Sequence, residues 1–359
     1  MKSIQGLQSD QTKGDGNMKI FKLICAGFIL GIGLNGGAFA ETVTLKFHSF
    51  APAPASQNSK FVQPWADRIE EQSGGELKVE TYYAMQLGGK PPQLVDQVRD
   101  GVVDIVWTVA GYTPGRFPKI EVFDLPFLPS SAEATSQAAQ DFAQTIAAEE
   151  LKDYKVLTVH VHAPGKIHTK DRLVKKLSDL EGLKMRGPTR VISSMLGAMG
   201  ATPVGMPVPQ VAPSLSKGVI DGMVVPYEIM PSFKLHELTK AHTTVSGERG
   251  LYTTAFLFLM NKAKYDSLSA SQKEVIDNNS GMSLAKLAGK LWDGFEGPAL
   301  QMAKKAGGEF HSLSGDSLAA FQAVGDQVVA DWISKANSNG MDGAAIVQSA
   351  RDLISKYEN

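Results

Sequence analysis

The chain has 359 residues, of which 43% are hydrophobic and 20% are charged, as in an ordinary globular protein. Its 36 basic and 37 acidic residues give a net charge of −1 at neutral pH. A balance of this kind gives no sign of a nucleic acid or of an anionic membrane surface as a partner.

The first 40 residues read as a leader and not as part of the fold. Residues 1–17 are polar and form an upstream extension, and residues 18–40 hold two lysines, an apolar run over 23–34 and the sequence Ala38-Phe39-Ala40. These are the three parts of a secretory signal peptide, with cleavage after Ala40. The apolar run is shorter than the roughly 20 residues of a membrane span. We therefore expect export to the periplasm of a Gram-negative bacterium and no membrane insertion of the mature chain.

Cys25, the only cysteine, lies in that apolar run. The mature chain then has no disulfide, no cysteine metal ligand and no cysteine nucleophile. The same segment contains Gly31-x-Gly33-x-x-Gly36, but no strand precedes this pattern and no helix follows it, so it does not predict a dinucleotide site. We expect no cofactor.

Short apolar runs alternate with helical patterns through the first two thirds of the mature chain. The predicted strands cover 43–47, 77–83, 102–109, 155–161, 183–186, 222–225 and 252–260, and the predicted helices include 58–72, 92–99, 132–149 and 191–199. This alternation predicts an α/β fold with open sheets. Residues 271–357 are almost wholly helical, with a break near 307–314. The mature chain, of about 320 residues, exceeds what one core usually serves, so two lobes are expected.

Two six-residue segments resemble each other. Residues 99–104 (Arg-Asp-Gly-Val-Val-Asp) and 217–222 (Lys-Gly-Val-Ile-Asp-Gly) each end a helix with a basic residue and a glycine and then open an apolar strand. Glycine tolerates the left-handed conformation that terminates a helix. We interpret them as one βαβ design used once in each lobe.

Three histidines raise the question of a metal or catalytic site. His160 and His162 lie two apart on a predicted strand, and His168 follows shortly after. They could form a zinc site or an acid–base pair. No H-E-x-x-H spacing and no acidic partner accompany them, so packing at the lobe junction or lining of a pocket is the favoured interpretation. We expect no metal and no catalytic residue.

Arg186 is the strongest candidate for a binding residue. It ends a short apolar strand, and Pro188 follows it. Ligands bind in the crevice at the carboxyl edge of open α/β sheets, and a guanidinium can hold a carboxylate through two parallel hydrogen bonds. The alternative from the residues alone is a surface salt bridge. Aromatic residues follow other predicted strands and could line the same crevice or pack in the core: Phe50, Trp107, Tyr112 and Tyr227.

The sequence resembles the DctP-type periplasmic solute-binding subunits of tripartite ATP-independent periplasmic (TRAP) transporters. The resemblance runs from about residue 43 to at least residue 268. It is carried by an ordered set of short motifs: Gln86-Leu87-Gly88-Gly89, Asp100-Gly101-Val102-Val103-Asp104, Asp124-Leu125-Pro126-Phe127, Asp179 to Arg186, Gly200-Ala201-Thr202-Pro203-Val204, Gly218-Val219-Ile220-Asp221-Gly222 and Met260-Asn261.

The resemblance implies a two-lobed periplasmic-binding-protein fold, type II-like, with open mixed sheets, an interlobe cleft and a helical C-terminal region. We expect lobe I over 41–163 and about 249–285, and lobe II over 164–248 with part of the C-terminal helices. Residues 286–359 then form a helical tail that packs on both lobes. The implied partners are a small organic carboxylate and the small and large membrane subunits of the transporter, and a monomer is favoured over a dimer.

The resemblance also implies that Arg186 holds the carboxylate, and the chain departs from well-known members around it. Val225 stands where those members have an asparagine, Val208 stands where several have a phenylalanine, and the turn that can carry a second arginine contains Lys166 and His168. Fewer polar anchors disfavour a polyhydroxylated sugar acid, since each unpaired polar group costs about 1–3 kcal/mol.

We therefore predict a monocarboxylate with an apolar or aromatic tail, such as a 2-oxo, 2-hydroxy or aromatic acid. A four-carbon dicarboxylate is the alternative if Lys166, His168 or Lys170 takes the second carboxylate. Two further alternatives are a secreted hydrolase or lyase that uses the histidines, and a sensory binding protein with the same fold.

Overall fold

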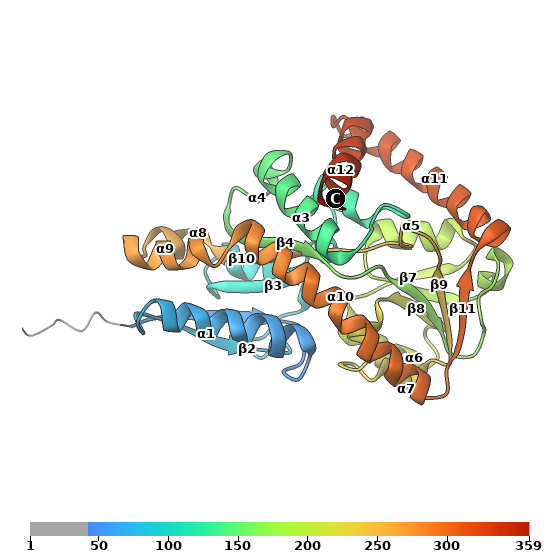
Figure 1. The fold of residues 1–359 in the computed structure, drawn as a ribbon, viewed down its shortest axis with the longest axis horizontal. Coiled ribbons are helices and arrows are strands. Elements are labelled where there is room, and N and C mark those ends of the chain that lie inside the picture. Colours follow the sequence, from blue (N-terminus) through green and yellow to red (C-terminus); the bar gives the residue numbers. More distant parts are fainter. Residues whose placement is uncertain (1–41, 359) are drawn as a thin grey trace, which may run out of the picture. The chain divides into compact units, whose positions relative to one another are not determined.

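The computed structural model describes residues 42–358, which build two β-sheets with helices around them (Figure 1). The predicted upstream extension (1–17) and signal peptide (18–40), with Cys25 and the glycine pattern, lie outside the described residues. Two separate mixed sheets within an α/β chain confirm the predicted fold class.

The first sheet has the strand order β2-β1-β3-β10-β4. Strand β1 pairs in parallel with β2 and β3, whereas β10 pairs antiparallel with β3 and β4. All five residues of β3 are buried, as its unbroken apolar run predicted. The bounds are β1 (Val43–Ser49), β2 (Leu77–Tyr82), β3 (Ile105–Val109), β4 (Tyr154–Val161) and β10 (Ala255–Asn261).

The second sheet has the order β11-β9-β5-β8-β6-β7, and four of its six strands were not predicted. The predicted strands are β6 (Lys184–Gly187) and β8 (Gly222–Val225); the others are β5 (Lys166–Thr169), β7 (Thr202–Gly205), β9 (Ala241–Val245) and β11 (Glu309–Leu313). The missed strands are only four or five residues long and contain polar residues or proline. The edge strands β7 and β11 are also largely exposed, so they carry no apolar run that periodicity could detect.

Helices cover both sheets, and residues 262–358 are almost wholly helical apart from β11 in the predicted break. The helix predicted over 132–149 is divided into α3 and α4. No helix within 42–358 combines the length and apolar character that crossing a membrane requires. The bounds are α1 (Gln63–Gln72), α2 (Leu94–Arg99), α3 (Ala132–Thr145), α4 (Ala148–Leu151), α5 (Arg190–Ala198), α6 (Val211–Ser216), α7 (Leu235–Leu238), α8 (Lys262–Asp266), α9 (Ala270–Asn278), α10 (Gly281–Lys305), α11 (Gly315–Ser338) and α12 (Gly343–Glu358).

The three long C-terminal helices link the surroundings of the two sheets. Helix α10 packs on α3 and β4 of the first sheet and reaches α7 beside the second sheet (Figure 1). The chain then adds β11 to the second sheet, passes along α5 as α11 and returns to α3 as α12. A rotation of one sheet against the other must therefore be accommodated by these helices.

Two chain segments that connect the sheets lie side by side. Residues 162–165 connect β4 to β5, and residues 246–254 connect β9 to β10. The amide of Gly165 donates a hydrogen bond to the carbonyl of Tyr252 at 2.8 Å, and a Cβ on Gly250 would lie only 2.1 Å from Cβ of Pro164. Glycine is required at position 250 because no side chain fits there. We call residues 162–165 and 246–254 the crossing segments.

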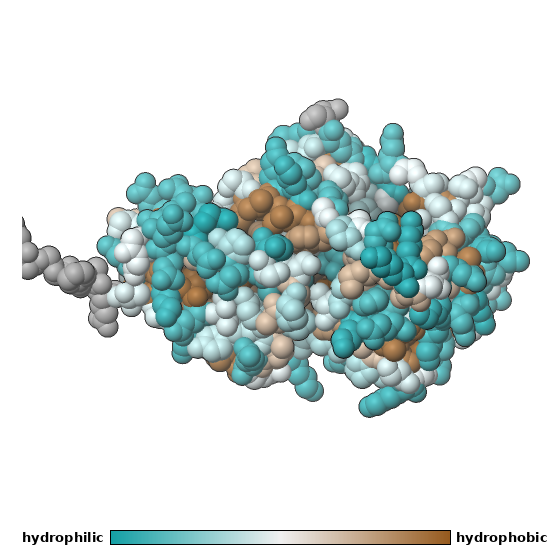
Figure 2. Space-filling view, turned by 60° about the horizontal axis from the view of Figure 1, so that its bottom comes forward, coloured by the Kyte–Doolittle hydropathy of each residue, from teal (hydrophilic) through white to brown (hydrophobic). Residues whose placement is uncertain are grey.

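The visible face in Figure 2 is mostly hydrophilic, and apolar residues gather on it in separate patches. Within 42–358 the large hydrophobic side chains with substantial exposure are Leu87, Val102, Val219, Leu287, Met302 and Phe310. Val102 and Val219 occupy equivalent places in the two similar six-residue segments. Apolar residues scattered in this way are ordinary on a protein surface.

The contact between α10 and α3 depends on a single glycine. A Cβ on Gly289 would lie 2.4 Å from the carbonyl oxygen of Ala132, whereas a Cβ on Gly294 of the same helix would meet nothing within 4 Å. We predict that Gly289→Ala lowers the free energy of unfolding by about 1–3 kcal/mol, because the helices must separate. The matched control Gly294→Ala should raise it by up to about 1 kcal/mol, since alanine favours helix over glycine. Chemical denaturation measures both; equal effects would contradict the close contact.

Candidate functional site

A cavity of about 410 Å³, counted with its open mouth, lies where residues of both sheets and of the crossing segments meet. Its lining consists of Phe50, Trp107, Val109, Tyr112, His162, Arg186, Pro188, Val208, Val225, Pro226, Glu228, Ile229, Tyr252, Thr254 and Phe256. Six of the nine ligand-binding residues predicted from the sequence are in this set: Arg186, Trp107, Tyr112, Phe50, Val225 and Val208.

Arg186 is the only cationic residue in this lining, and its side chain comes from β6. The residue is 2% exposed. Its Nε donates a hydrogen bond to the carbonyl of Met206 at 2.9 Å, and Nη1 donates to the carbonyl of Val224 at 3.3 Å. No carboxylate within 42–358 forms an ion pair with it. A guanidinium has five N–H groups, so most of its donors remain for a ligand.

Tyr112 provides a second donor beside Arg186. Its hydroxyl oxygen accepts a hydrogen bond from the amide of Val208 at 3.0 Å, which leaves the hydroxyl proton available. Burial raises the pKa of Tyr112, and the nearby charge of Arg186 opposes that rise. The phenol therefore stays protonated at neutral pH and can donate to an anion.

Stacked aromatic rings form one wall of the cavity. Trp107 stacks on Phe256 with ring centroids 4.4 Å apart and an interplanar angle of 9°, and on Phe50 at 5.3 Å and 27°. The indole Nε1 donates to Nε2 of His160 at 2.9 Å, which fixes the orientation of the Trp107 ring. Burial lowers the pKa of His160 to about 3, so this acceptor is neutral. The wall is apolar, flat and preorganised.

The crossing segments contribute polar residues that sequence reasoning did not assign to a binding site. His162 comes from the first segment, and Tyr252 and Thr254 come from the second. From the sequence, His162 was only one of three histidines that could line a pocket. Tyr252 and Phe256 fell within a predicted strand and carried no separate signal. Contact between two segments so far apart in sequence is a property of the fold.

Three predicted binding residues lie outside this lining. Lys166 forms an ion pair with Glu296 of α10. His168 is fully buried within the second sheet, where its Nε2 donates to the carbonyl of Val225 at 3.1 Å and its Nδ1 lies 2.8 Å from Nδ1 of His242. Tyr227 packs edge-on against His168 at 5.2 Å. Among residues 42–358, no three histidine, cysteine, aspartate or glutamate side chains are arranged to hold a metal ion.

Glu228 is a carboxyl group in the cavity lining that the sequence analysis did not single out. It lies in the short helix η7 (Tyr227–Ile229) and is 3% exposed. Burial, and next the negative charge of Glu296, raise the pKa of Glu228 to about 8. The carboxyl is therefore largely uncharged at neutral pH and does not repel an anionic ligand.

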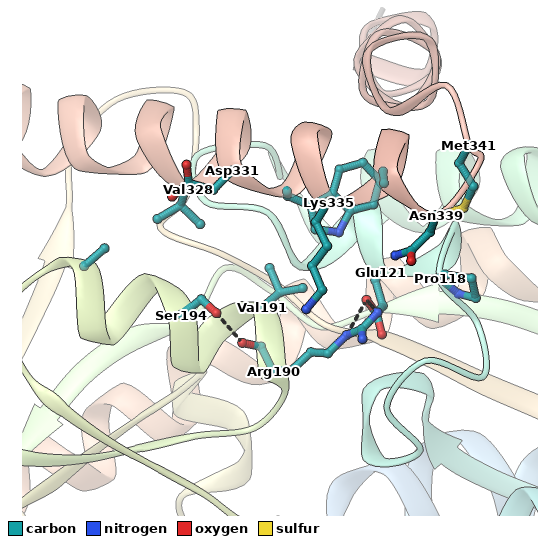
Figure 3. A pocket seen from close by; sticks show the side chains of 13 residues that line it. Pro118, Glu121, Arg190, Val191, Ser194, Val328, Asp331, Lys335, Asn339 and Met341 are labelled. Carbon is teal, nitrogen blue, oxygen red and sulfur yellow. Dashed lines mark hydrogen bonds and ion pairs between the residues drawn. The ribbon is translucent and has the colours of Figure 1, made fainter.

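A second hollow, of about 750 Å³, lies between α11, α5 and the short helix η4 (Ile120–Asp124) (Figure 3). Its arginine, Arg190, is already paired: Nε and Nη2 donate to Oε2 of Glu121 at 2.9 and 2.6 Å. Glu121 is 4% exposed. Nearby, a Cβ on Gly111 would lie 2.3 Å from Cγ2 of Thr189. These two contacts connect segments next to the first sheet with the start of α5, adjacent to Arg186.

Comparison with known proteins assigns the family. The family model for DctP, described as bacterial extracellular solute-binding protein, family 7, matches residues 48–335. A solved structure from an unidentified marine microbe, a TRAP solute-binding protein specific for aromatic acid ligands, is 70% identical. It covers 89% of this chain and 100% of its own, with a TM-score of 0.88, and contains 3-hydroxybenzoate.

Two more relatives agree with that assignment. A TRAP solute-binding protein from Rhodoferax ferrireducens, crystallised with copurified benzoate, is 44% identical and covers 88% of this chain and 99% of its own, with a TM-score of 0.87. The C4-dicarboxylate-binding periplasmic protein DctP of Rhodobacter capsulatus is 28% identical over 85% of this chain and 91% of its own. The family predicted from the short motifs is confirmed: the chain belongs to the DctP family of bacterial extracellular solute-binding proteins, whose relatives here serve TRAP transporters.

Proposed function

We propose that this protein captures an aromatic monocarboxylate in the cavity around Arg186 and delivers it to the membrane subunits of a TRAP transporter. The observation that carries the proposal is a buried guanidinium without a carboxylate partner, set in a cavity with aromatic walls. A buried charge is costly unless it is paired. The carboxylate of a ligand supplies the missing partner.

The ligand carboxylate is held by donors that are already in place. Arg186 and Tyr112 line the same cavity, and both carry groups that can donate a hydrogen bond to a carboxylate. A hydrogen bond to a charged group contributes about 1.5–3 kcal/mol, and low solvent access increases that value. Anchoring of the acid group therefore needs no other cation.

The tail of the ligand meets an apolar and aromatic surface. Phe50, Trp107 and Phe256 provide the flat wall, and Val225 contributes an apolar side chain at the position where the family resemblance implies an asparagine. The ligands of the 70% and 44% identical relatives, 3-hydroxybenzoate and benzoate, are aromatic monocarboxylates and support the proposal. Aromatic 2-oxo and 2-hydroxy acids belong to the same chemical class.

A four-carbon dicarboxylate fits this cavity less well. Its second carboxylate needs another cation, and Lys166 is neutralised by Glu296 while His168 is enclosed in the second sheet. Burial also lowers the pKa of His168 well below its usual value, so it is not a cation at neutral pH. The arrangement of these two residues therefore favours a monocarboxylate.

We further propose that the chain is exported by its signal peptide, works in the periplasm as a monomer and does not catalyse a reaction. Burial lowers the pKa of His160 and of His162 to about 3, so these two histidines are poorly matched to acid–base catalysis at neutral pH. The bound acid should be recovered chemically intact after long incubation with the protein.

Replacement of Arg186 tests the anchor. We predict that Arg186→Met weakens benzoate binding by about 10- to 100-fold, because the charge-assisted hydrogen bonds are lost. In the absence of ligand the variant should melt at a temperature close to that of the wild type, since a buried unpaired cation is removed. Isothermal titration and thermal unfolding measure the two effects.

Lys184→Met, an exposed position on the same strand, is the control and should bind benzoate normally. Unchanged affinity in Arg186→Met would refute the anchor.

The uncharged state of Glu228 makes binding sensitive to pH. As the pH rises through about 8, Glu228 acquires a negative charge beside the bound carboxylate, and the positive charge of Lys166 opposes this only in part. We predict that benzoate affinity falls by about three- to tenfold between pH 7 and pH 9. Glu228→Gln should show nearly constant affinity over this range in isothermal titration. A wild-type affinity that does not change with pH would contradict the prediction.

The raised pKa of Glu228 also makes the stability of the protein depend on pH. The pKa of Glu228 in the folded protein, about 8, lies above its ordinary value of 4.5, so the folded state holds a proton that the unfolded state releases. Its contribution to stability is thus fully present below about pH 4.5 and is lost as the pH rises to about 8. Glu228→Gln should therefore gain thermal stability relative to the wild type as the pH rises from 5 to 8.

A further inference from the structure

His162 is a polar side chain in the cavity lining that anchoring of the carboxylate does not use. It follows β4 directly, is 4% exposed and packs edge-on against the ring of Tyr252, with centroids 5.6 Å apart. Its position on the first crossing segment places it in the same cavity as Arg186. A buried polar group that lines a ligand cavity needs a partner, from the protein or from the ligand.

The hydrogen bonds of the His162 ring determine where its proton lies. Nδ1 is 2.6 Å from the carbonyl oxygen of Ala163. A carbonyl only accepts, so Nδ1 carries the proton and donates it. Burial lowers the pKa of His162 to about 3, so the ring holds a single proton at neutral pH. Nε2 therefore has a free lone pair, and it makes no hydrogen bond with any residue of the described chain.

The neighbouring polar groups differ from His162 in one respect. The hydroxyls of Tyr252 and Thr254, the phenol of Tyr112 and the guanidinium of Arg186 can all donate hydrogen bonds, whereas Nε2 of neutral His162 can only accept. The carboxylate of the ligand is itself an acceptor and gains nothing from a second acceptor. His162 is therefore matched to a hydrogen-bond donor on another part of the ligand.

We propose that Nε2 of His162 accepts a hydrogen bond from a hydroxyl group on the aromatic ring of the ligand, so that the cavity prefers hydroxy-substituted aromatic acids to unsubstituted ones. This inference rests on the proposed function, because it assumes that Arg186 holds the carboxylate. His162 is then the residue that determines specificity at the ring, and Arg186 is the residue that anchors the acid group. A site that pairs with a ligand hydroxyl discriminates against an analogue without it, because the site's own polar group loses its partner.

The affinities of three ligands distinguish His162 from other possible partners of the ring hydroxyl. Isothermal titration compares benzoate, 3-hydroxybenzoate and 3-fluorobenzoate; fluorine is a small polar substituent that cannot donate a hydrogen bond. We expect the wild type to bind 3-hydroxybenzoate about three- to tenfold more tightly than either of the others. If a donor such as Thr254 or Tyr252 were the partner, 3-fluorobenzoate would keep part of the gain.

Two variants at His162 and one matched control complete the test. His162→Phe keeps an aromatic ring but removes the acceptor, and we expect it to lose the preference for 3-hydroxybenzoate over benzoate. His162→Gln restores an acceptor and should recover part of the preference. Thr254→Val removes a neighbouring hydroxyl at nearly constant volume and should retain the preference in full. Thermal unfolding confirms that each variant is folded, and benzoate affinity is the internal standard.

Each result of these titrations either supports or refutes the role of His162. If the wild type binds none of the three acids, the proposed function fails and the inference fails with it. If it binds benzoate and 3-hydroxybenzoate equally, the function stands and the role of His162 is refuted. The role is also refuted if the preference survives in His162→Phe or disappears in Thr254→Val. Loss of the preference in His162→Phe alone, with recovery in His162→Gln, supports it.

Discussion

The site is organised around a charge that the protein buries without neutralising. The guanidinium of Arg186 is 2% exposed and donates hydrogen bonds to the carbonyls of Met206 and Val224. These dipoles orient the group but leave its charge uncompensated, which raises the free energy of the ligand-free protein. An anionic ligand removes that cost when it enters. The same interaction thus explains the affinity of the cavity for a carboxylate.

The fold brings together residues that lie far apart in the sequence. Arg186 comes from the second sheet, the aromatic wall from the first, and His162, Tyr252 and Thr254 from the crossing segments between them. Two contacts outside the cavity accompany this arrangement: the Glu121–Arg190 ion pair and the close approach of Gly111 to Thr189. Arg190 begins the helix that follows the strand of Arg186, so the ion pair lies close to the anchor in the chain. A partly exposed pair of this kind contributes modestly to stability.

The sequence predicted those parts of the fold that a short pattern of neighbouring residues marks. Short apolar runs predicted every strand of the first sheet, and a strand-end position together with the family motif made Arg186 the candidate anchor. The strands β5, β7, β9 and β11 are short and polar or exposed, so no periodicity marked them. Phe50, Trp107 and Tyr112, which were assigned to the crevice, line the cavity, but Tyr227 follows β8 and packs on His168. Nothing local distinguishes these cases, because the direction of a side chain after a strand depends on the turn that follows.

The selectivity of the cavity follows from the few polar groups that it contains and from their chemical type. With Val225 in place of an asparagine, a ligand with many hydroxyls would leave several of them unpaired, at about 1–3 kcal/mol each. A ligand with one acid group finds the donors of Arg186 and Tyr112, and a flat ring finds Trp107 and Phe256. Nε2 of His162, an acceptor with a fixed tautomer, and the carboxyl of Glu228 remain for a donor on the ring. Donors at the acid group and acceptors elsewhere favour one orientation of the ligand.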